Sequence, residues 1–304
     1  MRHPPTWGFL MLLAACEARI SGAPDDHGTI DAGSGGDAAA IDAPADGTAM
    51  LGPWSAPAKI LPASTTAAED DATLSSNALE MIFAVAGTNG KVLYYSSRAS
   101  TAVPWTAAVK LPFNGTLSDE TPRFSADDKT LYFASDRVLK GNLDIYSVSH
   151  PTPDALSWGT PQPITSVNTP ATEKWYMPCG TNRYIMVQGT ATNGTDFVEG
   201  TLGGVAPTAI TALNSMQSET GTLVSQDCLT IYFASARMTP QMMYKSHRTS
   251  LAAPWSNPAA VVDFPISGGN GNQEDPWMSI DGRTFVFASD AAGVGNKDIY
   301  ISTR

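Results

Sequence analysis

Five glutamates recur along the chain at nearly even intervals, which could bring their carboxylates together in a ring. Consecutive members are 51, 53, 46 and 55 residues apart. The five are Glu69, Glu120, Glu173, Glu219 and Glu274. Such a ring at the mouth of a funnel would bind a cation, a sugar or a basic peptide. The neighbouring Asp70, Asp71 and Asp275 would add negative charge to it.

The same period also fits a structural role. A residue present in every repeat serves a need that every repeat shares. Each glutamate would then bond to backbone amides or to an arginine of its own or the neighbouring repeat. The candidate arginines are Arg98, Arg137, Arg237 and Arg248. The regularity favours this role over catalysis, for which one or two members would have to differ from the rest.

Signatures of enzymatic chemistry are weak in this sequence. Hydrolysis of a glycoside needs two carboxylates about 5–9.5 Å apart, one with a raised pKa, and no such pair stands out. The sialidase-type Ser-x-Asp-x-Gly-x-Thr-Trp motif is absent, because the similar run from Ser279 to Phe285 has another spacing. The four histidines lack metal-ligand spacing. We therefore expect no catalytic residues, no metal, no cofactor and no enzymatic activity. A glycoside hydrolase using funnel carboxylates is the alternative.

The elements that position the glutamates are short strands. Apolar and polar residues alternate in Thr130–Ser135 and Asp144–Ser149, as in half-buried strands. Ser-x-Asp-Gly or a variant joins the first two strands of a repeat and suits a tight hairpin. A tryptophan flanked by prolines then opens an outer strand, as at Trp105 and Trp158. A period of about 50 residues with four strands is that of a propeller blade. We predict an all-β, five-bladed β-propeller of four-stranded antiparallel blades.

The two ends of the repeat region are out of phase with each other. It begins with an outer-type strand around Trp54 and ends with a third-type strand, Asp298–Thr303. A ring closes only if the first strand completes the last blade. We therefore predict that the strand of Trp54 pairs with the strand of Tyr300, which hides two open sheet edges.

These motifs together resemble the WD40-like PD40 repeat, the family that includes the propeller of the periplasmic protein TolB. The matching runs are Leu-Tyr-Phe-Ala-Ser at 131–135, Ser-Ile-Asp-Gly at 279–282 and Asp-Ile-Tyr at 144–146 and 298–300. The similarity covers residues 51–304, and the third repeat departs most. It implies a propeller of the bacterial envelope that binds a protein, a peptide or a cell-wall glycan. It specifies fold better than function.

The first 50 residues predict a membrane anchor. Residues 1–16 combine a short basic start with an apolar run that ends Leu-Ala-Ala-Cys, which resembles a lipoprotein signal with Cys16 as the lipid attachment site. An ordinary signal peptide with an incidental cysteine is the alternative. Residues 17–50 are rich in Ala, Gly and Asp and should form a disordered tether. We expect a lipid-anchored envelope protein at the outer membrane, periplasmic or surface-exposed.

Charge and the two other cysteines complete the sequence-based expectations. The net charge of −11, without a basic cluster, makes nucleic acid an unsuitable partner. Cys179 and Cys228 both align to the turn between the first two strands of neighbouring repeats, so a disulfide between them is possible in an oxidising compartment. Two thiols too far apart to bridge are the alternative. The expected function is that of a monomeric binding or scaffolding propeller.

Overall fold

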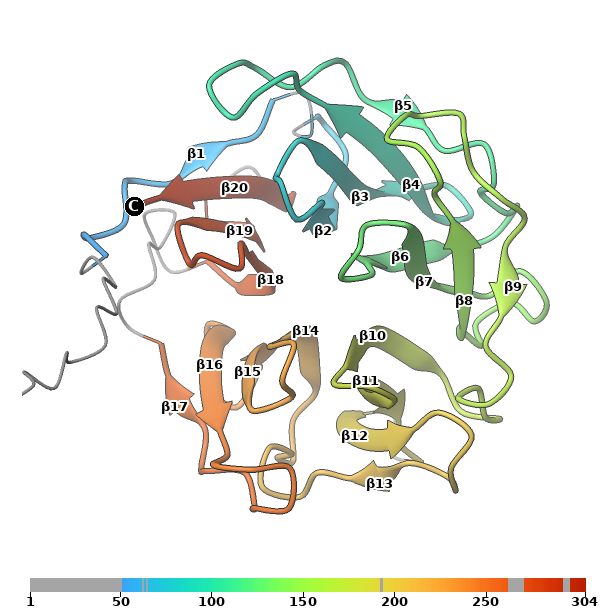
Figure 1. Cartoon of the computed structure of the whole chain (residues 1–304), viewed down its shortest axis with the longest axis vertical. Coiled ribbons are helices and arrows are strands. Elements are labelled where there is room, and N and C mark those ends of the chain that lie inside the picture. Colours follow the sequence, from blue (N-terminus) through green and yellow to red (C-terminus); the bar gives the residue numbers. More distant parts are fainter. Residues whose placement is uncertain (1–50, 62, 64, 192–193, 262–270, 292–295) are drawn as a thin grey trace, which may run out of the picture. The chain divides into compact units, whose positions relative to one another are not determined.

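The computed structural model describes residues 51–61, 63, 65–191, 194–261, 271–291 and 296–304. The predicted signal, Cys16 and the tether all lie outside the described residues. Every regular element in the described part is a β-strand, and the strands form five sheets of four. Figure 1 shows the five sheets of residues 51–304 arranged around a common axis. The prediction of a five-bladed, all-β propeller is confirmed.

Each blade runs from an innermost strand beside the axis to a two-residue outer strand. Blade one consists of β2 (Glu69–Leu74), β3 (Glu80–Gly87), β4 (Gly90–Ser97) and β5 (Val109–Lys110). Blade two consists of β6 (Asp119–Phe124), β7 (Thr130–Ser135), β8 (Asp144–Ser149) and β9 (Gln162–Pro163). Blade three consists of β10 (Glu173–Cys179), β11 (Arg183–Gly189), β12 (Thr195–Thr201) and β13 (Thr208–Ala209). Blade four consists of β14 (Glu219–Val224), β15 (Thr230–Ser235), β16 (Met242–His247) and β17 (Ala259–Ala260). Blade five consists of β18 (Gln273–Met278), β19 (Thr284–Ser289), β20 (Asp298–Thr303) and β1 (Ala58–Lys59).

The ring closes in blade five, where the first strand of the chain pairs with the last. Strand β1 is antiparallel to β20, with Ala58 opposite Ile301 and Lys59 opposite Tyr300. The Lys59 ammonium also pairs with the Asp298 carboxylate. The predicted closure is confirmed, but Trp54 precedes the strand instead of opening it. The Trp54 ring lies under the guanidinium of Arg304, 4.2 Å from the ring centroid.

The innermost strands share one irregularity near the axis. In every blade the pairing with the second strand shifts after the second residue, which is the register change of a β-bulge. The third residue then has a left-handed backbone with φ between 46° and 57°. The five residues are Asp71, Thr121, Trp175, Gly221 and Asp275. Because all five blades share this conformation, it belongs to the fold and not to one site.

Aromatic packing holds the outer parts of the blades. The predicted arginine partners Arg98 and Arg248 lie on the rings of Trp105 and Trp255, at 4.3 and 4.4 Å from the centroids. This is cation–π packing, and it leaves these arginines away from the five glutamates. In the described part of the chain, no helix is long and apolar enough to cross a membrane.

Candidate functional site

The five repeated glutamates do not occupy equivalent positions. Glu69, Glu173 and Glu219 are the first residues of their innermost strands, whereas Asp119 and Gln273 hold that position in blades two and five. Glu120 and Glu274 therefore stand one residue further on. Pairing agrees with this register, since Asp119 and Glu219 each lie opposite the last serine of the second strand. Asp119 precedes Glu120 and Gln273 precedes Glu274. In the sequence, this makes the one-residue difference in strand position hard to recognise.

The first-position carboxylates are buried and bond to the connection that precedes their own strand. Glu69, Glu173 and Glu219 are 0% exposed. Each accepts hydrogen bonds from a hydroxyl residue four positions earlier; Thr169 N, for example, lies 3.2 Å from Glu173 Oε2. Arg237 also pairs with Glu219, at 3.0 Å. Burial raises the pKa of Glu69 and of Glu173. These groups hold the loop between blades, as in the structural alternative.

A second set of charges lies where the innermost strands begin, and we call it the axial charge cluster. It joins second- and third-position acids to three lysines. Its members are Asp70, Asp71, Lys91, Glu120, Lys174, Glu274, Asp275 and Lys297. Blade four contributes none of them, because Thr220 and Gly221 hold the corresponding positions. The cluster therefore breaks the fivefold repeat.

Lysines link the acids of neighbouring blades within the cluster. Lys91 Nζ lies 2.8 Å from carboxylate oxygens of both Asp70 and Asp71, and 3.8 Å from Glu120. Lys174 Nζ lies 3.0 Å from the same Glu120 oxygen. Lys297 Nζ lies 2.5 Å from Glu274 Oε1 and 3.5 Å from Asp70 Oδ2. A chain of ion pairs thus crosses blades five, one, two and three.

The lysines are the exposed members of the cluster. Their side chains are 24–33% exposed, against 12% or less for the carboxylates that they pair with. The expected acidic ring is therefore not what this surface presents. The lysine side chains are only partly exposed, and they neutralise much of the negative charge of the buried carboxylates that they pair with.

The two deepest carboxylates of the cluster have pKa values that diverge. Burial raises the pKa of Asp275 well above its usual range, with a contribution from the charge of Asp71. Burial acts on Asp71 in the same sense, but the attraction and hydrogen bond of Lys91 outweigh it and lower the Asp71 pKa. The two carboxyls therefore differ in their affinity for a proton, which is high at Asp275 and low at Asp71.

Asp70 is the member poised to change its charge near neutral pH. Burial, followed by repulsion from Asp71, raises its pKa to about 7, although Lys91 and Lys297 oppose the shift. Its Oδ2 atom faces both lysines. Its Oδ1 atom is buried and has no hydrogen-bond partner among the described residues. A carboxyl group with this pKa can act as a proton donor or acceptor at neutral pH.

Sequence reasoning missed the three lysines, although a signal for two of them was present. Lys91 and Lys297 each stand three residues before a third-strand tyrosine, Tyr94 and Tyr300. The corresponding residues of blades two and four are Leu143 and Gln241. The lysine at this position is a feature of two adjacent blades, so it is not part of the pattern shared by all repeats.

The remaining predicted positions lie elsewhere. Cys179 and Cys228 form a disulfide between blades three and four, with Cα atoms 5.3 Å apart. It lies at the opposite ends of the innermost strands from the axial charge cluster. Across the residues with a described placement, no group of three or more His, Cys, Asp or Glu is arranged to hold a metal ion.

Comparisons with known proteins support the fold. No family model and no curated protein matches the sequence. A putative TolB of Agrobacterium tumefaciens is 15% identical, with a TM-score of 0.50 over 82% of this chain and 84% of that one. An α-L-arabinofuranosidase of Podospora anserina, in complex with cellotriose, is 11% identical, with a TM-score of 0.54 over 83% and 96%. The catalytic domain of a Coprinopsis cinerea arabinofuranosidase is 12% identical, with a TM-score of 0.53 over 83% and 97%.

These structures contradict the expectation that the chain has no enzymatic activity. The expectation rested on missing motifs and on the even spacing of the glutamates. Yet a propeller that this chain covers over 97% of its length is, by itself, the catalytic domain of a glycosidase. A bare propeller of this size is therefore sufficient for hydrolysis. At this identity the likeness shows the fold alone.

Proposed function

We propose that this chain is an envelope-anchored propeller that binds a cell-wall glycan over its axial charge cluster. The observation that carries the proposal is the break in fivefold symmetry, which brings three partly exposed lysines onto buried carboxylates at one end of the axis. The fold does not require the axial charge cluster, since blade four forms its sheet without contributing a charged residue to it.

The charge balance of the cluster favours a neutral, hydroxyl-rich ligand. Three lysines oppose five acids, of which Asp70 has a pKa of about 7 and Asp275 a raised pKa, so protonation of these two acids reduces the negative charge of the cluster. A strongly basic or acidic polymer would gain little net attraction there. Sugar hydroxyls both donate and accept hydrogen bonds, so they can pair with exposed ammonium groups and with carboxylate edges at once.

The envelope location rests on the sequence. The run ending at Cys16 resembles a lipoprotein signal, and the acidic tether would hold the propeller away from the lipid surface. A cell-wall polymer is a ligand that such an anchored domain would meet. The fold shared with TolB-type propellers agrees with this setting.

Binding tests should compare a cluster lysine with a lysine outside it. Titration calorimetry would measure the affinity of the wild type for soluble cell-wall fragments and cello-oligosaccharides. We expect Lys174→Met to weaken binding by about tenfold, since it removes a charged hydrogen-bond donor. Lys129→Met makes the same change at an exposed turn residue and should leave the affinity unchanged. Equal losses in the two variants would contradict the proposed site.

Hydrolysis of the bound glycan is a second candidate, favoured by the pKa contrast between Asp70 and Asp71. A carboxyl group with a pKa of about 7 next to a carboxyl group with a lowered pKa is the kind of contrast that a general acid and its partner show in glycosidases. Incubation with 4-nitrophenyl glycosides, α-L-arabinofuranoside included, tests it. Release of nitrophenol should decline above pH 7 and disappear in Asp70→Asn. Binding without turnover would eliminate hydrolysis and leave glycan binding intact.

A further inference from the structure

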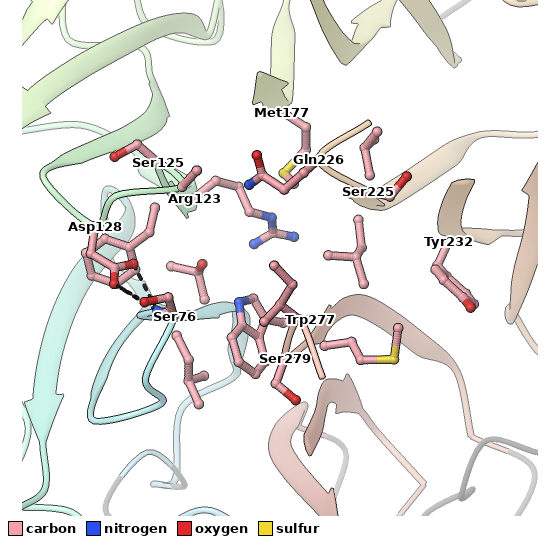
Figure 2. Close-up of a pocket in the computed structure, with 18 of the residues that line it drawn as sticks. Ser76, Arg123, Ser125, Asp128, Met177, Ser225, Gln226, Tyr232, Trp277 and Ser279 are labelled. Atoms are coloured by element: carbon pink, nitrogen blue, oxygen red, sulfur yellow. Dashed lines mark hydrogen bonds between the residues drawn. The ribbon is translucent and has the colours of Figure 1, made fainter. Parts of the chain in front are cut away.

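A cavity opens at the other end of the axis from the axial charge cluster, among the turns that follow the innermost strands. Its volume is about 380 Å³, and residues from all five blades line it. Figure 2 shows the Arg123 side chain reaching into the middle of this cavity, with Trp277 across from it. A cavity of this size accommodates a small organic molecule.

Among the described residues, the buried cation Arg123 has no carboxylate partner. It is 2% exposed and donates to main-chain oxygens, at 2.8 Å to Pro122 and at 3.4 Å to Ala72 and Thr222. Its Nη2 atom has no hydrogen-bond partner, and no acid lies within ion-pair distance among the described residues. Burial lowers its pKa, and Asp275 and Asp71 oppose this from further away.

An unpaired buried guanidinium is costly unless an anion compensates for it. The three carbonyl contacts fix its position by joining blades one, two and four, but they leave one nitrogen unused. Carboxylates are the groups that best match the planar donor edge of a guanidinium. This unpartnered nitrogen is itself buried, but it belongs to a residue that lines the cavity, so it marks the place for a carboxylate from a ligand.

The residues that line the cavity indicate what kind of ligand body and charge would fit. Phe124, Met177, Leu223 and Trp277 give it an apolar lining close to Arg123. The two acids of the wall are engaged locally: Asp128 accepts from Ser76, and Asp227 accepts from Ser225. Their charges disfavour a multiply charged anion such as phosphate. A monoanion with an apolar body suits both features.

We propose that this cavity is a binding site for small apolar carboxylates, with the carboxylate on Arg123 and the apolar body against Trp277. It lies at the opposite end of the axis from the glycan site and does not depend on it. Two sources have this chemistry, namely a free organic acid and the C-terminal carboxylate of a peptide that ends in an apolar residue.

The probes are 3-phenylpropionate and the tripeptide Gly-Gly-Phe, each compared with its own amide by titration calorimetry on the whole protein. The acids should bind, and the amides should bind at least about tenfold more weakly because they lack the charge. Preference for 3-phenylpropionate identifies the free acid as the source, and preference for Gly-Gly-Phe identifies the peptide terminus. Equal binding of acids and amides would overturn the proposal.

Three variants test the position of the site. Arg123→Met should reduce the affinity for the preferred acid by about tenfold or more, whereas Arg283→Met, at an exposed arginine that does not line the cavity, should not. Ala126→Trp fills the exposed edge of the wall and should also weaken binding. If Arg123→Met fails to fold, Ala126→Trp still decides. Unchanged affinity in Ala126→Trp, or no saturable binding of any probe up to about 1 mM, would overturn the site.

Discussion

Asp71 and Asp275 share a single donor at the axis of the propeller. Their Oδ1 atoms lie 3.1 and 3.0 Å from the same indole Nε1 of Trp175. The Asp71 N–H also donates to Asp275 Oδ2, at 3.2 Å. Both acids are buried, so these contacts replace the water that would otherwise solvate the two carboxyls. They also join blades one, five and three across the axis.

Replacing Trp175 by Phe should therefore destabilise the ring through the lost donor. We expect urea unfolding to show a loss about 2 kcal/mol larger than that of Trp255→Phe, since buried acceptors would be left without a partner. The control is well matched, because both indoles are 7% exposed and the Trp255 Nε1 has no hydrogen-bond partner among the described residues. Similar losses in the two variants would show that packing alone sets the role of Trp175.

The raised pKa of Asp70 predicts that stability falls as pH rises from about 4 to 7. In this range the folded protein keeps a proton on Asp70, with its pKa of about 7, while the unfolded chain has released it. Unfolding then releases a proton and becomes easier with increasing pH, by about 1.4 kcal/mol per pKa unit of difference. The free energy of unfolding, measured by denaturant titration across this range, should decline less steeply in Asp70→Asn.

The matched control for that pH series is Asp281→Asn. The pKa of Asp281 is lowered by its hydrogen bonds to Ser279 and Arg283, so it is ionised in both states above pH 5. The variant should keep the wild-type slope between pH 5 and 7. A slope in Asp70→Asn that matches the wild type would place the titrating group elsewhere.

Deleting residues 51–61 should weaken the propeller far more than trimming a loop. The deletion removes β1, its pairing with β20 and the ion pair between Lys59 and Asp298. We expect a loss of about 3–5 kcal/mol from these hydrogen bonds, seen as a fall in Tm of roughly 10 °C for a domain of this size. Deletion of residues 204–205, at an exposed turn, is the control. An unchanged Tm would contradict the closure.

Reduction of the disulfide between Cys179 and Cys228 should also lower stability. The bond closes a loop of 49 residues between two blades, which corresponds to about 2–4 kcal/mol. Thermal melts with and without dithiothreitol would measure the effect. A Cys179→Ala/Cys228→Ala variant should melt at the reduced temperature under both conditions. Free thiols at both positions in the unreduced protein would contradict the pairing.

The fold could be predicted from the sequence because the blades are encoded by a repeat. The period, the hairpin motifs and the mismatch between the Trp54 and Tyr300 ends give the blade number and the closure. Aligning the repeats on the glutamates shifts blades two and five by one residue. In these blades Asp119 and Gln273 are the first residues of the innermost strand, in place of a glutamate. A carboxylate at that position needs only a hydroxyl residue or backbone amide nearby, so its identity is loosely constrained.

Most residues of the candidate sites could not be predicted from the sequence, because they depart from the repeat. Lys91 and Lys297 depart from the repeat, and Lys174 contacts Glu120 across a blade boundary. Arg123 occupies a position where the other blades carry Thr73, Met177, Leu223 and Trp277. Which of these residues faces the axis depends on the bulge that precedes it. That conformation follows from contacts between blades and not from local sequence.

The closure of blade five also sets the order of events during synthesis. Lys59 and Asp298, which pair across the closing strands, are 239 residues apart. At the usual rates of synthesis the first strand must wait for on the order of 10 to 50 s before its partner exists. During that interval β1 cannot pair with β20, and any blade that forms does so without a closed ring. A partly made chain therefore carries an open sheet edge until the last strand arrives.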